Sequence, residues 1–364
     1  MQMEKPLPNN SVKSMIGVFA NAILADIHMS KYEVKKICGI GSNGCVFLVE
    51  DKHDNQLYAM KCVNLSYYIT KRFHLNLSEI HSEIYIMFDE LSKRIMGSKY
   101  QIADYPQKIV SNFDSMAEKN SFFREFEALK RLPHTYKTVY LVDYGYFNIK
   151  SDGEINFQCK IPYIIMPLMS GTPLTCYIES TISPSKRLKT VLLWTEEIID
   201  IVSLIHDKRV IHRDLYSNNF LFDPNSGHVN LIDFGAALTL GHEELDTPGE
   251  RRGARRFMSP EQFRDPRNVD FRSDYFFIGA LMFYGLTTKT PFERSREVST
   301  LPQSFKKAYK NELFLSMDAV SSLDIFISTI SEYAPEKRFQ TIGEIQRSFC
   351  YVKTILEREL SKYE

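Results

Sequence analysis

The stretch VIHRDLYSNNFLF, residues 210–222, interrupts an apolar run with His-Arg-Asp and becomes apolar again after Asn219. It places an acid, Asp214, and an amide, Asn219, on one loop. A carboxylate in such a loop can accept a proton from an attacking hydroxyl, and an amide oxygen can ligate Mg²⁺. Because an unpaired acid is costly inside a protein, a polar loop between apolar strands needs partners of this kind. The stretch therefore predicts a reaction site.

A second acid follows a short distance along the chain. The segment NLIDFGAAL, residues 230–238, places Asp233 directly after an apolar strand, with Phe-Gly behind it. Mg²⁺ prefers carboxylate oxygens combined with substrate phosphates. The two segments therefore predict a magnesium site that uses Asn219 and Asp233.

Two further motifs lie upstream. GIGSNGCV, residues 39–46, has glycines that let a backbone approach phosphate oxygens closely. The same spacing occurs in Rossmann folds, where a helix follows, but here the strand-like CVFLVED follows, so the pattern favours a glycine-tipped hairpin. Taken alone, it also fits a plain turn. YAMK, residues 58–61, ends in Lys61, which could reach phosphates or simply extend its ammonium into solvent.

The composition limits the class of protein. A chain of 364 residues is long enough for two domains, and 44% hydrophobic with 25% charged residues is ordinary for a globular protein. Lys+Arg and Asp+Glu are both 45, so no charge excess points to nucleic acid. The six cysteines show no C-x-x-C spacing, which favours reduced thiols in an intracellular, cytoplasmic protein. We expect no signal peptide and no membrane span, because the apolar stretch 15–27 is shorter than the ~20 residues a span needs.

The pattern along the chain changes from strands to helices. Residues 31–63 alternate as strands, 122–134 have helical spacing, and 138–147 and 161–169 again look like strands. From residue 188 onward the pattern is mostly helical. This order predicts a two-lobed α+β protein.

Together these motifs resemble the signature set of the eukaryotic-type protein kinases. The likeness extends over residues 31–349 and includes FMSPE (257–261), similar to the A-P-E box, and SDYFFIGALMFYGLTTKTPF (273–292), similar to the helix that carries a buried acid, here Asp274. APEKRF (334–339) supplies Arg338, which in the family pairs with the glutamate of A-P-E, here Glu261. The resemblance implies a bilobal kinase fold, with an extension over 1–30, a small β-rich N-lobe over 31–169 and a larger helical C-lobe over 170–364.

The family also has a glutamate that pairs with the strand lysine. REFEALKRLPH, residues 124–134, matches its E-I-x-x-L-x-x-L-x-H pattern with Glu125 in the first slot, and a strand follows. Glu83 is the alternative; it is nearer to Lys61 in sequence but lacks that strand. Choosing Glu125 implies an insertion over residues 64–120, which could be regulatory, a docking surface or a surface decoration.

The resemblance assigns roles to these residues. Asp214 would orient and deprotonate a hydroxyl of a protein substrate, Asn219 and Asp233 would hold Mg²⁺, and Lys61, paired with Glu125, would hold the α- and β-phosphates of ATP. The cofactors implied are ATP and Mg²⁺. The residues implied to contact the nucleotide are Gly39, Ile40, Gly41, Ser42, Asn43, Gly44, Val46, Ala59, Lys61, Met166, Pro167, Met169 and Leu221.

The catalytic loop departs from the family pattern at one position. Ser/Thr kinases usually carry a lysine two residues after the catalytic acid and a threonine before A-P-E, where this chain has Tyr216 and Ala254. Tyrosine kinases put a tryptophan before their M-A-P-E, where this chain has Phe257. We favour Ser/Thr specificity and leave dual specificity open. A cation from ERRGARR (250–256) could replace the lysine, or that run could be a solvated loop. If the usual pair is merely missing, the double replacement Tyr216→Lys and Ala254→Thr should raise turnover.

Arg213, just before the catalytic acid, often receives a phosphate from the activation segment in the family. Thr239 and Thr247 lie in that segment, although either could equally stay unmodified.

Other interpretations stay open. A pseudokinase that acts as a nucleotide-binding scaffold or allosteric partner is favoured by Tyr216, Ala254 and the insertion, and opposed by the complete set of reactive residues. A small-molecule kinase is opposed by the SPE box and Arg338, which in the family build the platform for protein substrates. Atypical kinases share the D-x-x-x-x-N…DFG run but generally lack this Gly-rich loop. The sequence gives no indication of an oligomeric state.

Overall fold

The computed structural model describes residues 29, 31–41, 44–63, 121–151, 157–180, 182–241, 257–265, 267–289 and 315–362. They belong to two compact units. Unit 1 consists of Met1–Phe126 and Leu141–Leu168, and unit 2 consists of Glu127–Tyr140 and Met169–Glu364. The division passes through helix α6 (Ser121–Arg131).

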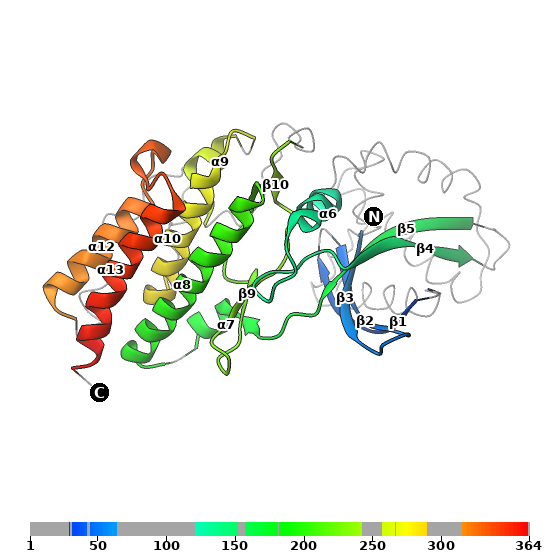
Figure 1. Ribbon diagram of the computed structural model, residues 1–364, viewed down its shortest axis with the longest axis horizontal. Coiled ribbons are helices and arrows are strands. Elements are labelled where there is room, and N and C mark those ends of the chain that lie inside the picture. Colours follow the sequence, from blue (N-terminus) through cyan, green and yellow to red (C-terminus); the bar gives the residue numbers. More distant parts are fainter. Residues whose placement is uncertain are drawn as a thin grey trace, which may run out of the picture. The chain divides into compact units, whose positions relative to one another are not determined.

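Unit 1 is built on one antiparallel sheet. Its strands are β1 (Tyr32–Gly41), β2 (Gly44–Asp51), β3 (Leu57–Val63), β4 (Asp143–Ser151) and β5 (Phe157–Pro167), in the order β1-β2-β3-β5-β4 (Figure 1). The pairing places Phe47, Met60 and Ile165 side by side across three strands, and all three are fully buried. Because side chains alternate between the two faces of a strand, Lys61 leaves the opposite face from Met60.

The glycine-tipped hairpin predicted from the sequence is confirmed. β1 and β2 pair along their length up to Gly41 opposite Gly44, so the third glycine of the motif opens the returning strand. Ser42 and Asn43, between them, lie outside the described residues. Strand β3 then pairs antiparallel with β2, with Val46 opposite Lys61.

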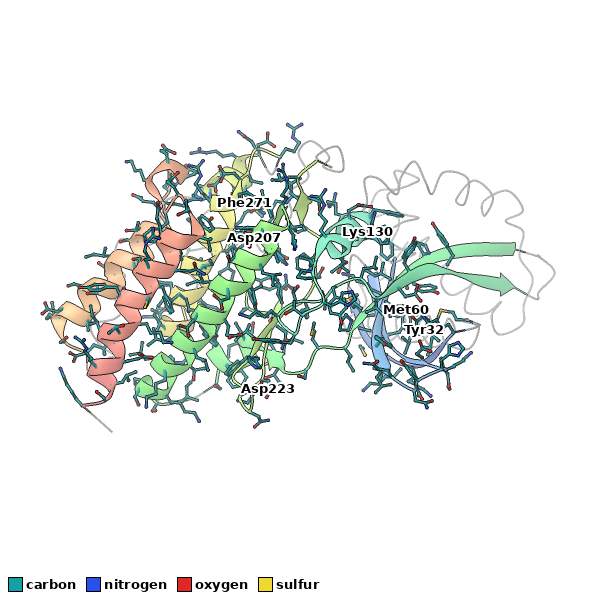
Figure 2. The ribbon with its side chains drawn as sticks, in the orientation of Figure 1. Tyr32, Met60, Lys130, Asp207, Asp223 and Phe271 are labelled. Carbon is teal, nitrogen blue, oxygen red and sulfur yellow. The ribbon has the colours of Figure 1, made fainter. Side chains whose placement is uncertain are left out.

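A polar cluster joins the two edge strands of this sheet. Asp143, at the start of β4, accepts hydrogen bonds from the Lys31 ammonium and the Tyr32 hydroxyl, each at 2.8 Å. Tyr32 is labelled in Figure 2 and is 2% exposed. Strands β1 and β4 are the two opposite edges of the sheet. The sheet must therefore curl so that the start of β1 comes close to the start of β4. The cluster therefore fixes the curvature of the sheet.

Unit 2 is mostly helical. Its helices are α7 (Leu174–Ile178), α8 (Pro184–Asp207), α9 (Pro260–Arg264), α10 (Phe271–Thr287), α12 (Met317–Ile330), the 3₁₀ turn η2 (Pro335–Lys337) and α13 (Ile342–Leu360). Short strands connect them: β6 (Thr172–Pro173), β7 (Val210–Ile211), β8 (Phe220–Phe222), β9 (Val229–Leu231) and β10 (Leu238–Thr239). Helix α10 packs against α8 and α12, and α13 packs against α8 and α12 (Figure 1).

Helix α10 is buried on nearly all sides, and two glycines allow its neighbours to approach. A Cβ at Gly285 would lie 2.5 Å from Cζ2 of Trp194 on α8, so no larger residue fits without movement. Gly279 similarly faces Ser331, just after α12. The helix begins at Asp270, whose side chain accepts from the Arg272 amide, as expected of an N-cap.

The predicted fold class is confirmed: a β-sheet N-terminal region precedes a helical C-terminal part. The helices expected over residues 122–134 and 273–288 form as α6 and α10. The strand expected from residue 138 begins only at Asp143, because Thr138 forms an isolated bridge to Leu231 instead. The insertion over 64–120, and the extension over 1–30 apart from Met29, lie outside the described residues. The domain boundary at residue 169 stays a prediction.

Candidate functional site

The loop between β7 and β8, expected from the sequence to be the catalytic loop, is held by a buried acid on helix α10. Asp274, on α10, is fully buried, and its carboxylate accepts the backbone N–H groups of His212 at 2.8 Å and Arg213 at 2.9 Å. The ring Nε2 of His206, at the end of α8, lies 2.9 Å from the same carboxylate. A buried carboxylate needs several donors, and these satisfy it. They also fix the backbone that leads into Asp214.

Asp214 and Asn219 are brought together by the loop. The Asn219 side-chain amide donates to the backbone oxygen of Asp214 at 2.8 Å and to its carboxylate Oδ2 at 3.1 Å. The turn between them is closed by the Tyr216 N–H on the Asp214 carbonyl and the Asn219 N–H on the Tyr216 carbonyl. The amide nitrogen of Asn219 is thus committed to Asp214, and its Oδ1 is the atom suited to a metal.

Asp233 is joined to the same loop through the backbone. The Ile232 N–H donates to the Asn219 carbonyl at 2.8 Å. The residue directly before Asp233 is therefore hydrogen-bonded to the loop that carries Asn219. Its own φ is +67°, in the left-handed region, and its Oδ1 accepts the Gly235 N–H at 3.0 Å. A non-glycine residue in that region is uncommon and is often found at functional sites. The structure therefore gathers Asp214, Asn219 and Asp233 within unit 2.

Arg213 also has a positive φ, +64°, and its side chain turns inward. The guanidinium donates to the Ala236 carbonyl at 2.7 Å and to the Ala237 carbonyl at 3.3 Å, and the Arg213 carbonyl accepts from the Gln262 side chain. It thus ties the catalytic loop to the segment after Asp233. Thr239, a candidate for phosphorylation, is 2% exposed in β10, which favours an unmodified residue; Thr247 lies outside the described residues.

His212 is neutral at physiological pH. Burial lowers its pKa to about 4, against the opposing influence of the Asp274 and Asp233 carboxylates. Its Nδ1 accepts the Asp214 N–H at 3.2 Å, so a proton on Nδ1 would break that hydrogen bond. The ring also packs against Phe234, with centroids 4.8 Å apart. The neutral ring therefore supports the backbone of Asp214.

In unit 1, the structure brings Lys61 and Glu125 together. The Lys61 ammonium lies 2.5 Å from Oε2 of Glu125, and the two residues are only 6% and 1% exposed. The pair forms because Lys61 leaves the sheet on the face opposite Met60 and α6 presents Glu125 to it. Glu83, the other candidate for this pairing, lies outside the described residues.

The residues expected to contact a nucleotide are distributed over both units. Gly39, Ile40, Gly41 and Gly44 lie in the β1–β2 hairpin, Ala59 pairs with Met166 across β3 and β5, and Pro167 ends β5. Met166 is 6% exposed, as a core residue would be. In unit 2, Met169 precedes β6, and Leu221 is the middle residue of β8, opposite Asn230.

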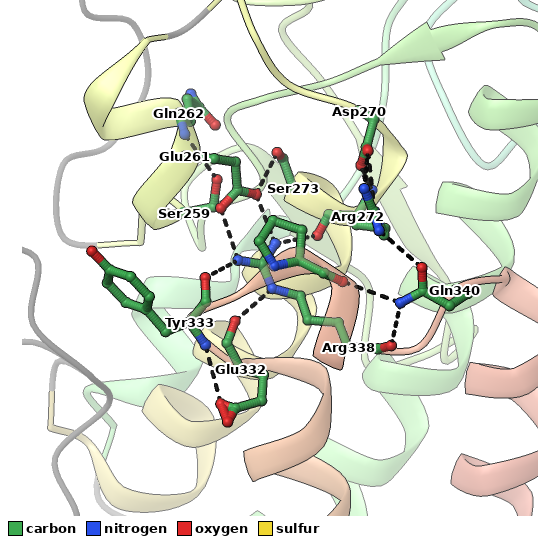
Figure 3. A network of polar contacts seen from close by, with 11 residues as sticks. Ser259, Glu261, Gln262, Asp270, Arg272, Ser273, Glu332, Tyr333, Arg338 and Gln340 are labelled. Carbon is green, nitrogen blue, oxygen red and sulfur yellow. Dashed lines mark hydrogen bonds and ion pairs between the residues drawn. The ribbon is translucent and has the colours of Figure 1, made fainter.

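A buried ion pair supports the segment after the catalytic loop (Figure 3). The Arg338 guanidinium makes two hydrogen bonds to the Glu261 carboxylate, at 2.7 and 2.8 Å, and Ser273 donates to the same carboxylate. Further Arg338 N–H groups bind the carbonyls of Glu332, Arg272 and Tyr333. Although the site is partly desolvated, Arg338 and Ser273 hold the pKa of Glu261 below its usual value. The pairing predicted for Arg338 and Glu261 is confirmed.

Several of these partners were not found by sequence reasoning. Gln262 and Thr175 contact the loop between β7 and β8 from other elements, and His206 contacts Asp274, which holds that loop. A histidine at the end of a helix just before the loop is a weak signal for His206. Gln262 and Thr175 carry no signal of their own, since their roles depend on how the chain folds back.

The architecture defines the class: a β-sheet unit with a buried Lys–Glu pair and a helical unit with this loop are the parts of a kinase fold. The chain belongs to the protein kinase family, because the protein kinase domain model matches residues 103–349, more than half of its length. Within the described residues, no helix is both long enough and apolar enough to cross a bilayer.

Relatives support the family assignment. The chain is 26% identical over 294 residues to the probable serine/threonine-protein kinase PknB of Lactococcus lactis, covering 78% of this chain and 44% of that protein. It is 27% identical over 241 residues to the serine/threonine-protein kinase PrkC of Bacillus subtilis, covering 59% of this chain and 36% of that protein. The match thus spans less than half the length of these two relatives.

The fold has a counterpart among solved structures. The crystal structure of the Mycobacterium tuberculosis PknI kinase domain aligns with a TM-score of 0.53 at 16% identity, covering 90% of this chain and 98% of that one. At this identity the likeness concerns the fold alone.

Proposed function

We propose that this protein is an ATP-dependent protein kinase that transfers the γ-phosphate to serine or threonine hydroxyls of protein substrates. The observation that carries the proposal is the Lys61–Glu125 ion pair. Taking two charges out of water costs several kcal/mol per ion, roughly, and an ion pair often fails to recover it relative to apolar packing. A pair buried this deeply is better explained by a functional role than by a contribution to the stability of the fold.

The residues of unit 2 fit a magnesium-bound nucleotide. Asn219 directs its amide nitrogen to Asp214 and keeps an oxygen as its remaining polar atom, and Asp233 is a half-buried carboxylate. Both are hard oxygen donors of the kind Mg²⁺ prefers. When bound, ATP supplies the phosphoryl group and Mg²⁺ neutralises charge on its phosphates. In this proposal Asn219 and Asp233 hold the metal, Lys61 holds the phosphates, and Asp214 orients and accepts the proton of the substrate hydroxyl.

The residues proposed to contact the nucleotide complete the site. The glycines of the β1–β2 hairpin would approach the phosphates through their backbone, while Ala59, Val46, Met166 and Leu221 would enclose the base. Backbone groups from Pro167 to Met169 would recognise the adenine edge.

A protein rather than a small molecule is the proposed substrate. Arg338 joins α9 to the turn before α13 through two hydrogen bonds to Glu261, and three more bonds of its guanidinium go to backbone carbonyls nearby. So much buried polar bonding supports a rigid surface beside the catalytic loop. The Ser/Thr specificity rests on the names of the relatives, and their matched length leaves the substrates of the whole protein a matter of proposal.

A cytoplasmic location is proposed with it. Cys38, Cys176 and Cys350 are exposed thiols without a disulfide, which suits a reducing compartment.

The pseudokinase alternative is favoured by Tyr216 and Ala254, which stand where Ser/Thr kinases usually carry a lysine and a threonine, and by the insertion over residues 64–120. A positional peptide library incubated with Mg-ATP separates the two. The proposal predicts labelled peptides and phosphoserine or phosphothreonine after hydrolysis. Nucleotide binding with no labelled peptide would favour the scaffold, and phosphotyrosine alone would overturn the Ser/Thr assignment.

A further inference from the structure

Helix α7 is joined to the loop between β7 and β8 by Thr175. Its hydroxyl hydrogen-bonds the side chain of Asn218 at 2.5 Å and the hydroxyl of Ser217 at 2.6 Å. Glu179, the C-cap of α7, keeps helical backbone angles, with φ −81° and ψ −10°. Side chains four positions apart lie on the same face of a helix, with Cβ atoms about 5–6 Å apart. Glu179 therefore lies one helical turn from a residue that contacts this loop.

The carboxylate of Glu179 is exposed and only weakly engaged. Within the described residues its side chain has one hydrogen-bond partner, the Tyr284 hydroxyl on α10, which donates to Oε1 at 3.3 Å. That distance is long, because O–H···O hydrogen bonds usually measure about 2.5–3.0 Å. Exposed Glu196 on α8, by contrast, is paired with the Lys353 ammonium at 2.7 Å. Glu179 is thus a surface carboxylate with most of its acceptor capacity left for a partner.

The backbone of Glu179 is held in place on both sides. The guanidinium of Arg187, on α8, donates to the carbonyl of Ile178 at 2.8 Å and to the carbonyl of Ser180 at 2.9 Å. The Glu179 N–H itself donates to the Thr175 carbonyl at 2.9 Å. Binding an ion at this carboxylate therefore requires little further ordering of the chain.

The surroundings of Glu179 suit a peptide bound at Asp214. The ring of Tyr284 packs edge-on against Phe257, with centroids 5.6 Å apart, and Phe257 lies just before α9. Contacts thus run from the loop of Asp214 through α7 and α10 to the segment before α9. An extended peptide advances about 3.3 Å per residue, so a side chain a few residues from an acceptor hydroxyl at Asp214 reaches Glu179.

We propose that Glu179 is a specificity-determining residue, whose carboxylate binds a lysine or arginine side chain of the protein substrate a few residues from the acceptor hydroxyl. This inference rests on the proposed kinase activity and adds a substrate preference to it. Hydrogen bonds between a cation and a carboxylate are the stronger class, and a guanidinium can bind both carboxylate oxygens at once. Solvent screens an exposed pair, so we expect a preference for a basic residue rather than an absolute requirement.

The test uses steady-state kinetics on the full chain with Mg-ATP. A serine peptide library with each flanking position fixed in turn first identifies the position at which lysine or arginine is preferred. Two peptides that differ only there, with arginine or glutamine, are then compared by their kcat/KM values. For wild-type protein we expect a ratio of about 5–20 in favour of arginine, between the effect of an exposed ion pair and that of a charge-assisted hydrogen bond. The ratio should shrink as NaCl is added.

The decisive variants change the charge of one exposed side chain. Glu179→Gln should bring the ratio to about one, and Glu179→Lys should make a peptide with glutamate at that position the better substrate. Glu196→Gln is the matched control and should keep the wild-type ratio, because its carboxylate is already paired with Lys353.

Two results would overturn the inference while leaving the kinase activity established. One is a wild-type protein without a basic preference, and the other is a ratio in Glu179→Gln or Glu179→Lys equal to that of Glu196→Gln. A wild-type protein that binds nucleotide but labels no peptide would instead overturn the proposed function.

Discussion

Replacing Arg338 by methionine removes the guanidinium from the network of Figure 3 while keeping an aliphatic side chain of similar length. The Arg338 side chain is fully buried and that of Glu261 is 15% exposed. Without Arg338 the Glu261 carboxylate keeps the Ser273 hydroxyl, and three backbone carbonyls lose a donor. Removing one partner of a buried ion pair costs about 3–5 kcal/mol, mostly because the other charge stays buried. We expect a loss of this size in the free energy of unfolding.

The single tryptophan makes this loss measurable in unit 2. Trp194 is 2% exposed on α8, so its fluorescence reports the unfolding of the helical core. With a urea m-value of about 2–3 kcal/mol per M, the expected loss lowers the urea midpoint by about 1–2.5 M.

The matched control is Arg267→Met. Arg267 makes the same two-pronged contact with Asp265, but the two side chains are 48% and 41% exposed, so its removal should leave the midpoint unchanged. Equal midpoints for Arg338→Met and Arg267→Met would refute the reasoning. The stabilisation also depends on pH in one direction. Because the folded protein holds the pKa of Glu261 below its ordinary 4.5, the advantage over Arg338→Met persists at neutral pH and shrinks as pH falls below about 4.5.

Three further outcomes are expected. In the folded protein the buried His212 stays neutral at pH values where the unfolded chain, with a histidine pKa near 6.5, binds a proton. The free energy of unfolding should therefore fall by up to about 3 kcal/mol between pH 6.5 and 4. A His212→Tyr variant whose free energy of unfolding, measured by urea titration, has the same pH dependence as the wild type would contradict this. Gly285→Ala should lower the free energy of unfolding by about 1–3 kcal/mol, because the added methyl group overpacks against Trp194. An unchanged urea midpoint and tryptophan emission maximum would contradict this, since they would show that α10 and α8 can move apart without loss of stability. Glu125→Gln should lower kcat/KM for ATP at least about tenfold, because it weakens the charge-assisted contact with Lys61. The control Glu127→Gln, on the same helix and paired with Lys130, should leave kcat/KM unchanged. Equal effects of the two changes in a coupled assay would contradict a role of the Lys61–Glu125 pair in the reaction.

Much of this fold could be predicted because its signals are local. The glycine hairpin follows from Gly39, Gly41 and Gly44 together with the strand that succeeds them. Helix α10 follows from a long apolar stretch, and the partner of Arg338 follows from a motif shared across a family. Such features depend on a few neighbouring residues or on a pattern already known.

The parts that could not be predicted depend on distant contacts. Thr138 has the residues of a strand around it but bridges to Leu231, which lies 93 positions further along the chain (231 − 138), so no local signal indicates the contact. Thr175 is an ordinary polar residue of a short helix until the fold places it against Asn218. The neutral state of His212 likewise depends on complete burial, which no short motif specifies.

The most direct test of the central claim measures ³²P transfer from γ-labelled ATP to a peptide in the presence of Mg²⁺. Wild-type protein is compared with Asp214→Asn, which keeps the size and the hydrogen-bond acceptor of the residue that Asn219 holds. The account predicts transfer by wild-type protein and a loss of at least about a hundredfold in Asp214→Asn, with ATP affinity preserved, because only the proton acceptor is gone. Equal transfer by the two proteins, or none by a wild-type protein that binds ATP, would contradict it.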